Sequence, residues 1–280
     1  MKPAQFAMHR PRTLTEALDI LDAEGEGARL IAGGQSLVPM MNLRLATPAV
    51  LIDLNRVAGL ADIREDGDVI RIGAAARQQA LLESELIRSR APLLAAAVRH
   101  TGHLATRCRG TVGGNLAHAD PASELVLAAI TLRGQVTLQS KQRTREVPAE
   151  GFFRDTLTTA IEPGEILTEL SIPAAPAGTK AVFREHARRA GDFAIAAAAG
   201  QRTSSGDVLQ VAVGAVAPVP RICRHIEGAH DTGRLAGAID ALVAAEIEEI
   251  EPIADIRSGA SYRRKLAFVC LNDCLREVLA

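Results

Sequence analysis

The chain is poor in aromatic side chains. Tryptophan is absent, and the 280 residues include one tyrosine and six phenylalanines. The hydrophobic core must therefore be built from alanine, valine, leucine and isoleucine. An aromatic side chain that falls inside a motif is, for the same reason, a stronger functional signal here than in an ordinary sequence.

An excess of charge of either sign is also missing. The chain has 32 lysines and arginines against 33 aspartates and glutamates, a formal net charge of -1. This balance gives no electrostatic basis for binding nucleic acid or an anionic membrane surface. No stretch approaches the ~20 apolar residues of a membrane-spanning helix, and residues 1–18 lack the continuous apolar segment of a signal peptide. We expect neither nucleic-acid binding nor a membrane span.

Cysteine and metal-binding patterns are sparse. The four cysteines, Cys108, Cys223, Cys270 and Cys274, are too few for a disulfide framework in a chain of this length. A reducing, cytoplasmic location is therefore expected. The seven histidines show no H-E-x-x-H spacing. We predict no metal site on this chain and assign no catalytic residue.

What the sequence does contain is two short glycine loops, AGGQS at 32–36 and TVGGN at 111–115, each after an apolar stretch. Two consecutive glycines let backbone N–H groups come close to a phosphate or another anion. Neither loop matches G-x-G-x-x-G or G-x-x-x-x-G-K-[ST], which disfavours a Rossmann site and a P-loop. Two such loops together suggest a ligand with a diphosphate in its middle.

Polar groups near the second loop extend this interpretation. Asn115 offers an amide, and Glu124, at the start of the next helix, can accept hydrogen bonds from sugar or polyol hydroxyls. Arg107 and Arg109 flank the loop and can complement phosphate charge. The alternative from the residues alone is that the loops are ordinary tight turns and that the arginines are solvated surface residues.

The pattern of elements predicts two domains, as does the length. We expect a capped amphipathic helix over 13–24, strands at 28–32, 50–54 and 69–75, and helices near 92–100 and 122–132. The proline- and glycine-rich segment 173–178 predicts a linker, with a boundary near residue 177. Beyond it, strands give way to helices over 233–249 and 261–279.

At the level of whole motifs, the chain resembles the FAD-binding medium subunit of the molybdenum hydroxylases, the family of carbon monoxide dehydrogenase and xanthine dehydrogenase. The motifs that carry this resemblance are AGGQSLVPMMNLRLA (32–46), RCRGTVGGNLAHADPASE (107–124), GEILTELSIP (164–173), FREHARRAGDFAIAAAA (183–199) and YRRKLAFV (262–269). They occur in the family's order and span nearly the whole chain.

The resemblance implies an α+β fold. A two-subdomain FAD-binding domain of the PCMH, or vanillyl-alcohol-oxidase-like, type would occupy 1–177, with subdomains of about 1–56 and 57–177. A small C-terminal α+β domain of the CO dehydrogenase flavoprotein type, with an antiparallel sheet and helices, would occupy 178–280.

The same resemblance implies that the two glycine loops clamp the FAD diphosphate. The implied cofactor-binding residues are Ala32, Gly33, Gly34, Gln35, Ser36, Thr111, Val112, Gly113, Gly114, Asn115, His118, Glu124, Leu167 and Arg184.

Individual positions carry more specific expectations from the family. Glu124 stands where the family usually has Asp, Leu167 lies in the segment whose backbone approaches the flavin ring, and Arg184 replaces a Lys of some members. Phe193 matches an aromatic near the isoalloxazine face that is often Tyr, so stacking remains but one hydrogen bond is lost. Cys108 departs from the family's common Asn.

By resemblance, the chain is an electron-transfer subunit. A large subunit would hold the molybdenum cofactor, a small subunit would hold two [2Fe–2S] clusters, and FAD on this chain would pass electrons to an external acceptor. The expected assembly is a dimer of heterotrimers in the cytoplasm, either free or peripheral at the inner membrane. Two alternatives stay open: a stand-alone flavin-dependent oxidoreductase, and a non-catalytic flavin-binding or assembly module.

Overall fold

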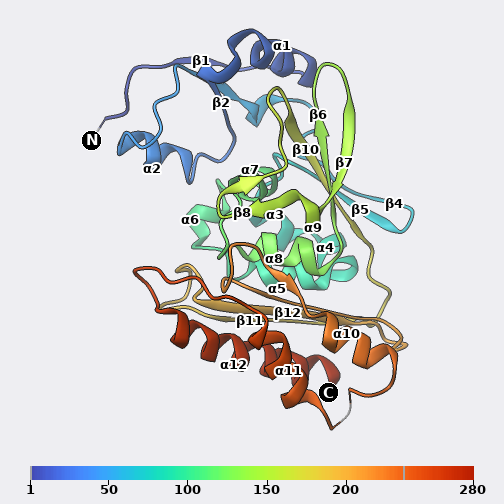
Figure 1. The fold of residues 1–280 in the computed structure, drawn as a ribbon. Helices are drawn as coiled ribbons and strands as arrows, with labels where there is room; N and C mark the ends of the chain where they lie inside the picture. The colour runs from blue at the N-terminus through green and yellow to red at the C-terminus, as the bar shows by residue number, and fades with distance from the viewer. Residues whose placement is uncertain (1, 236) are drawn as a thin grey trace.

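The computed structural model describes residues 2–235 and 237–280. They form three layers, from the N-terminal sheet at the top of Figure 1 to the C-terminal helices at the bottom. The top layer is a parallel sheet in the order β1-β3-β2. Its elements are β1 (Ala7–His9), α1 (Leu14–Glu24), η1 (Gly25–Gly27), β2 (Ala28–Ile31), α2 (Leu37–Asn42), β3 (Val50–Asp53) and η2 (Leu54–Arg56).

The helix α1 begins where the sequence predicts. Thr13 is its N-cap, and the Thr13 hydroxyl accepts a hydrogen bond from the Glu16 backbone N–H at 3.2 Å. The second half of a capping box is shifted by one residue, because the Glu16 carboxylate accepts from the N–H of Arg12 instead of Thr13. Ala17 and Leu18 are buried against the sheet.

The middle layer is built on an antiparallel sheet in the order β4-β5-β10-β6-β7. Its strands are β4 (Ile63–Asp66), β5 (Val69–Gly73), β6 (Gln135–Gln139), β7 (Thr144–Pro148) and β10 (Ile166–Pro173). A bulge at Leu167–Glu169 interrupts the pairing of β10 with β6. Because a bulge bends a strand and re-aims its side chains, this irregularity shapes the start of β10.

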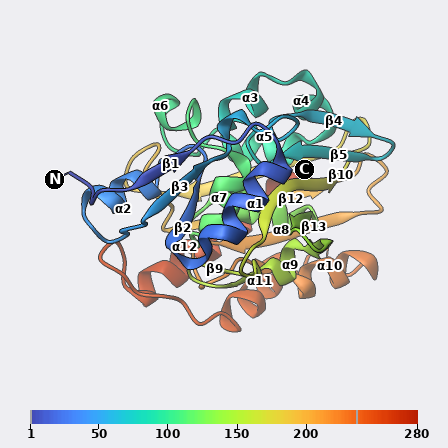
Figure 2. The same ribbon diagram turned by 90° about the horizontal axis from the view of Figure 1, so that it is seen from above.

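Short helices fill the space beside this sheet. They are α3 (Gln78–Glu83), α4 (Glu85–Arg90), α5 (Pro92–Val98), α6 (Leu104–Arg107), α7 (Val112–His118), α8 (Glu124–Thr131) and α9 (Ala149–Phe152), with a small hairpin of β8 (Phe153–Asp155) and β9 (Thr158–Thr159). The helix α8 is buried along its whole length. Seen from above, the N-terminal sheet and α1 lie over the middle of the molecule, in the region of α7 (Figure 2).

The bottom layer is an antiparallel sheet in the order β11-β12-β13-β14, with helices beneath it (Figure 1). Its elements are β11 (Lys180–His186), β12 (Ala196–Arg202), β13 (Leu209–Gly214), β14 (Arg221–Ile222), α10 (Arg224–Asp231), α11 (Ile239–Glu248) and α12 (Ala260–Leu279). The predicted α+β class and the antiparallel C-terminal sheet are confirmed.

Both faces of this sheet are buried. Ala197 and Ala199 belong to the core that α5 and α8 share with the middle layer, whereas Ala196 and Ala198 belong to the core under α12. Alanine is a poor strand former, but its small side chain lets helices pack closely on either face. The C-terminal sheet therefore packs against the middle layer on one face and against α12 on the other.

Two predicted elements differ from the structure. The TVGGN segment is not a loop throughout, because Gly113 and Gly114 lie in the first turn of α7, after the N-cap Thr111. The helix predicted over 233–249 begins only at Ile239. Gly233 and Gly237 take φ angles of 69° and 83°, which a right-handed helix does not allow. Residue 236 lies outside the described residues.

Candidate functional site

A cavity of about 800 Å³ lies between the N-terminal sheet, α7 and the loop before β12. It brings together most residues that the sequence predicts for the cofactor. The predicted residues among its lining are Ala32, Gly33, Gly34, Gln35, Ser36, Thr111, Gly113, Gly114, Asn115, His118, Glu124, Leu167 and Phe193.

The first glycine loop carries free backbone donors. Within the described part of the chain, the N–H groups of Gly33, Gly34, Gln35 and Ser36 have no protein acceptor. Gly34 has a φ of 71°, a conformation that glycine adopts without strain. Consecutive N–H groups on a loop that lines a cavity form a concave anion-binding surface. This loop can bind a diphosphate.

Gly33 has a second role, which is to let the two loop regions touch. A Cβ atom at this position would lie 2.4 Å from the Arg109 carbonyl oxygen and 2.8 Å from Gly110 Cα. Because both atoms belong to the backbone, neither can rotate away. The first loop therefore packs directly on the segment that precedes the second loop.

A polar bridge that the sequence does not signal reinforces this contact. The Arg77 guanidinium donates to the Arg109 carbonyl oxygen and, at 2.6 Å, to Asn55 Oδ1. Asn55 Nδ2 donates in turn to the Ala32 carbonyl oxygen at 2.8 Å. Arg77 thus ties the first loop to the segment before the second loop through two side chains that lie far apart in the sequence.

The second glycine pair differs from the first, since its backbone donors are already used. The N–H groups of Val112 and Gly113 donate to Ala76 and Ala74 carbonyl oxygens, and that of Gly114 donates to Thr111 Oγ1. A Cβ on Gly113 would lie 2.5 Å from Ala74 Cβ. The second glycine pair therefore lets the start of α7 pack closely on Ala74, whereas the first loop provides the free N–H donors.

Side chains beyond the second pair offer ligand contacts. Asn115 Oδ1 accepts the Ser123 hydroxyl at 2.5 Å, which leaves the Asn115 amide NH₂ for a ligand. His118 lies in the last turn of α7 and lines the cavity. Val112 does not line it, because its side chain is fully buried in the core.

Glu124 is the titratable group of the cavity wall. Its side chain is buried at the start of α8, and Oε2 accepts the Thr101 hydroxyl at 2.9 Å. Burial, with a smaller contribution from the nearby carboxylate of Glu185, raises the pKa of Glu124 to about 7, although the hydrogen bonds from its own backbone N–H and from Thr101 and the charge of His100 act to lower it. Near neutral pH, the Glu124 carboxyl is therefore protonated in part of the molecules, where it can donate a hydrogen bond, and ionised in the rest, where it can only accept one.

We predict that Glu124→Gln stabilises the FAD-free chain at alkaline pH. A carboxyl whose pKa is higher in the folded chain destabilises that chain increasingly as pH rises from about 4.5 to about 7. A shift from 4.5 to about 7 corresponds to at most about 3.5 kcal/mol, because one pKa unit is worth ~1.4 kcal/mol. Urea unfolding followed by circular dichroism at pH 8 and pH 4.5 should show a gain for the variant at pH 8 only. Equal effects at the two pH values would contradict a buried, titrating Glu124.

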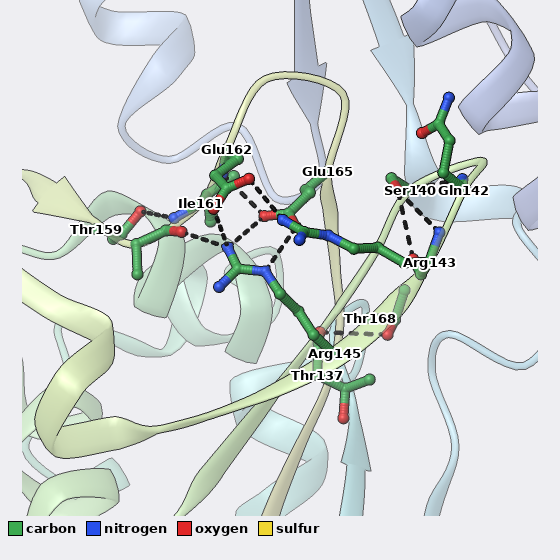
Figure 3. Close-up of polar contacts among 11 residues, drawn as sticks. Thr137, Ser140, Gln142, Arg143, Arg145, Thr159, Ile161, Glu162, Glu165 and Thr168 are labelled. Carbon is green, nitrogen blue, oxygen red and sulfur yellow. Dashed lines mark hydrogen bonds and ion pairs between the residues drawn. The ribbon is translucent and has the colours of Figure 1, made fainter.

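The segment that carries Leu167 is held by an ion pair between the partly exposed Arg145 and the buried Glu165 (Figure 3). Arg145 on β7 contacts both carboxylate oxygens of Glu165 at 2.7 Å and donates to the Ala160 carbonyl oxygen at 2.7 Å. Glu165 Oε2 also accepts the Glu162 backbone N–H at 2.8 Å. The hydrogen bonds from Arg145 lower the pKa of Glu165 despite its burial.

This pair positions part of the cavity wall. Ile161, Gly164, Glu165 and Leu167 all line the cavity, and the bulge in β10 follows directly at Leu167–Glu169. Arg145 and Glu165 are 20 positions apart and match no motif, so no sequence pattern indicates that they pair.

Two of the three predicted arginines, Arg107 and Arg184, are occupied by protein partners, whereas Arg109 is exposed. Arg184 on β11 forms an ion pair with Glu277 and does not line the cavity. Arg107 donates to the carbonyl oxygens of Thr101 and Gly102, at 3.1 Å and 2.9 Å. The cofactor contact of Arg184 stays a prediction.

Phe193 comes from the C-terminal sheet. It lies in the loop between β11 and β12, is 58% exposed and contributes to the cavity wall. Gly191 in the same loop has a φ of 82°, and a Cβ there would lie 2.7 Å from the His103 ring. The loop therefore packs against the start of α6.

The described residues, 2–235 and 237–280, hold neither a metal-binding cluster nor a membrane-spanning helix. Within these ranges, no three His, Cys, Asp or Glu side chains gather in a metal-binding arrangement. No helix of the described chain has the length and apolar character needed to cross a bilayer. Cys108 is exposed, while Cys223, Cys270 and Cys274 are buried thiols.

Comparison with known proteins gives matches over nearly the whole chain. Residues 4–175 match the family described as the FAD binding domain in molybdopterin dehydrogenase, and residues 181–278 match the CO dehydrogenase flavoprotein C-terminal domain.

Curated relatives and a solved structure extend this result. The chain is 36% identical over 289 residues to the carbon monoxide dehydrogenase medium chain of Hydrogenophaga pseudoflava, covering 100% of this chain and 99% of that protein. It is 35% identical to subunit alpha of the 6-hydroxypseudooxynicotine dehydrogenase complex of Paenarthrobacter nicotinovorans, over 100% and 96% of the two chains. A carbon monoxide dehydrogenase structure from Hydrogenophaga pseudoflava superposes with a TM-score of 0.93 at 35% identity, covering 100% of this chain and 99% of that one.

Proposed function

Because this chain belongs to the family of FAD-binding subunits of molybdopterin dehydrogenases, we propose that it is the electron-transfer subunit of a heteromeric molybdenum hydroxylase. The observation that carries the proposal most directly is the cavity, in which a loop with free N–H donors faces Glu124 and Phe193. The assignment of individual residues to parts of FAD belongs to the same proposal.

The residues present fit FAD. The free N–H groups of Gly33 to Ser36 would bind the diphosphate, and Gly114, which lines the cavity, leaves room for the N-cap hydroxyl of Thr111, which a Cβ would approach to 2.8 Å. Glu124 and the Asn115 amide would bind hydroxyl groups of the ligand. When bound, FAD links one-electron carriers to two-electron acceptors.

The chain's own residues then have three tasks. The first loop and Glu124 bind, the Arg145–Glu165 pair orients the wall at Leu167, and Phe193 shields the mouth from water. Glu124 can hold or release a proton near neutral pH, since its pKa is about 7. Electron transfer through FAD does not require acid–base residues that act on a substrate on this chain.

We propose the partners from the names of the relatives. These are a medium chain and a subunit alpha of enzyme complexes, and the chain itself is a subunit of such a complex. The proposed partners are a large subunit with the molybdenum cofactor and a small subunit with two [2Fe–2S] clusters, as a dimer of heterotrimers.

The remaining proposals concern organisation and place in the cell. We propose an FAD-binding domain at 1–177, with subdomains of about 1–56 and 57–177, and a C-terminal domain at 178–280. The four free thiols support a cytoplasmic location, free or peripheral at the inner membrane. NAD, a quinone, oxygen or a carrier protein would accept the electrons.

Affinity purification of the tagged chain from its own cells tests this proposal. We expect FAD, molybdenum and iron to copurify in constant ratio with two further subunits. A chain that purifies alone with FAD and oxidises a small molecule without molybdenum would identify a stand-alone flavoenzyme. A chain that takes up no FAD even when FAD is supplied would identify a non-catalytic module.

A further inference from the structure

Two loops of the C-terminal layer meet beside Phe193, which lines the cavity. One is the loop that carries Phe193, and the other is segment 251–259, which leads into α12. The Arg188 guanidinium of the first loop donates to the carbonyl oxygens of Ile256 and Arg257, at 3.3 Å and 2.9 Å. In Figure 1 both loops extend toward α6 at the same end of the sheet.

A cation lies over the Phe193 ring. The Arg257 guanidinium carbon is 5.4 Å from the ring centroid, within the range of a cation–π interaction. Phe193 is 58% exposed and would otherwise be free to change rotamer. Arg257 therefore restricts the one aromatic ring that the C-terminal layer contributes to the cavity wall.

Asp255 fixes Arg257. Its Oδ2 accepts Arg257 Nε at 2.8 Å and lies 2.7 Å from Nη2, while Oδ1 accepts the backbone N–H groups of Arg257 and Ser258 at 2.8 Å and 3.0 Å. These bonds define both the side chain and the backbone of Arg257. Burial alone would raise the pKa of Asp255, but the hydrogen bonds and the charge of Arg263 lower it to about 2.

The buried side chain of Arg263 contacts both loops. It lies in the first turn of α12 and is 0% exposed, and its Nη2 forms an ion pair with Asp255 Oδ1 at 2.9 Å. Arg263 Nη1 donates to the Ile195 carbonyl oxygen at 2.9 Å, two residues after Phe193. One buried guanidinium therefore connects to the Phe193 loop and, through Asp255, to the Arg257 loop.

We propose that Arg263, Asp255 and Arg257 are positioning residues that hold Phe193 in place for the flavin ring of the bound cofactor. The inference rests on the proposed function, since it takes Phe193 to lie beside the flavin. Arg257 acts through Phe193 and is not itself a residue of the cavity wall. Through these contacts, residues of the C-terminal layer would determine the position of Phe193 beside the flavin.

The first readout needs no cofactor. In the FAD-free full-length chain, chymotrypsin cleavage after Phe193 reports how often the loop opens, and cleavage after the half-exposed Tyr262 serves as the internal reference. Arg257→Gln should raise the ratio of Phe193 to Tyr262 cleavage roughly two- to fivefold, as expected for loss of a partly exposed cation–π contact. Arg257→Lys keeps the cation and should restore much of the protection. Asp255→Asn should act like Arg257→Gln.

Arg276→Gln is the matched control. Arg276 lies on the same helix α12 and pairs with Asp240 at 2.7 Å, far from the cavity mouth. We expect it to leave the cleavage ratio unchanged. An unchanged ratio in both Arg257→Gln and Asp255→Asn would overturn the positioning chain.

The second readout uses the purified complex. If Arg257 acts through Phe193, Arg257→Gln and Phe193→Leu should each speed FAD release and raise flavin fluorescence, and the double variant should match Phe193→Leu alone. Additive effects would show that Arg257 acts independently of Phe193 and would contradict the inference. Faster cleavage with unchanged FAD release would also overturn it, while leaving the proposed function intact, because the wild-type complex would still bind FAD.

Discussion

Gly33→Ala is expected to weaken FAD binding to the chain. The added methyl group would meet the Arg109 carbonyl oxygen at 2.4 Å and Gly110 Cα at 2.8 Å, and backbone atoms cannot yield as a side chain would. Relief requires the first loop to move away from the second. Overpacking of this kind costs ~1–3 kcal/mol, and ~1.4 kcal/mol is a factor of ten in affinity, so we expect FAD affinity to fall about tenfold or more.

Gly27→Ala is the control for this prediction. Gly27 precedes the same strand, β2, has no positive φ, and a Cβ there would meet only Ala49 Cβ at 3.9 Å. FAD content, measured by absorbance after purification and extraction, should match the wild type for Gly27→Ala and fall for Gly33→Ala. Full FAD content in Gly33→Ala would show that contact between the loops is not needed for the cofactor.

Glu165→Gln is expected to cause the largest loss of folding stability. Glu165 is buried, and Arg145 contacts both of its carboxylate oxygens at 2.7 Å (Figure 3). Loss of one partner of a buried pair costs ~3–5 kcal/mol, and here Glu165→Gln would leave the Arg145 guanidinium with only the more distant carboxylate of Glu162, at 3.5 Å. Because the Arg145 side chain is 24% exposed, we expect the lower end, about 3 kcal/mol. Urea unfolding followed by circular dichroism measures it, since the chain has no tryptophan to report fluorescence.

The pH dependence of stability gives an independent check on the same pair. The pKa of Glu165 is lower in the folded chain, so its stabilising contribution is present above the ordinary carboxyl pKa and lost as pH falls through the folded value. Glu165→Gln should lose this acid dependence. Arg143→Gln is the control, because Arg143 is 53% exposed and lies 3.5 Å from Glu165, so its change should stay below ~1 kcal/mol. Equal losses for the two variants would contradict a dominant role of Arg145.

Local signals in the sequence predicted much of the fold. Thr13 and Glu16 predicted the start of α1, and the prolines and glycine of 173–178 predicted a linker, where β10 ends at Pro173 and β11 begins at Lys180. The glycine pairs predicted two loops that approach one diphosphate ligand, and both loops line the same cavity; the close packing of the chain on itself at these glycines was not predicted. Gly33 and Gly113 both pack in this way.

What the sequence could not predict depends on contacts between distant residues. Nothing near Arg263 signals that its guanidinium is buried beneath two loops, and nothing near Arg77 signals a bridge to Asn55. The Thr111 N-cap turns the second glycine pair into the start of a helix whose donors are used within the protein. Such outcomes depend on tertiary packing, which no single segment encodes.

The central claim is that electrons leave the iron–sulfur clusters of a partner through FAD on this chain. The direct test is the anaerobic reoxidation rate of reduced clusters in the purified complex, followed by electron paramagnetic resonance after mixing with NAD, a quinone or a dye. For any acceptor that serves the wild type, we predict fast reoxidation in the wild-type complex and slow reoxidation in the FAD-depleted Gly33→Ala complex. Equal rates in the two complexes would contradict the claim, because the electrons would then leave by a route that avoids this chain's cavity.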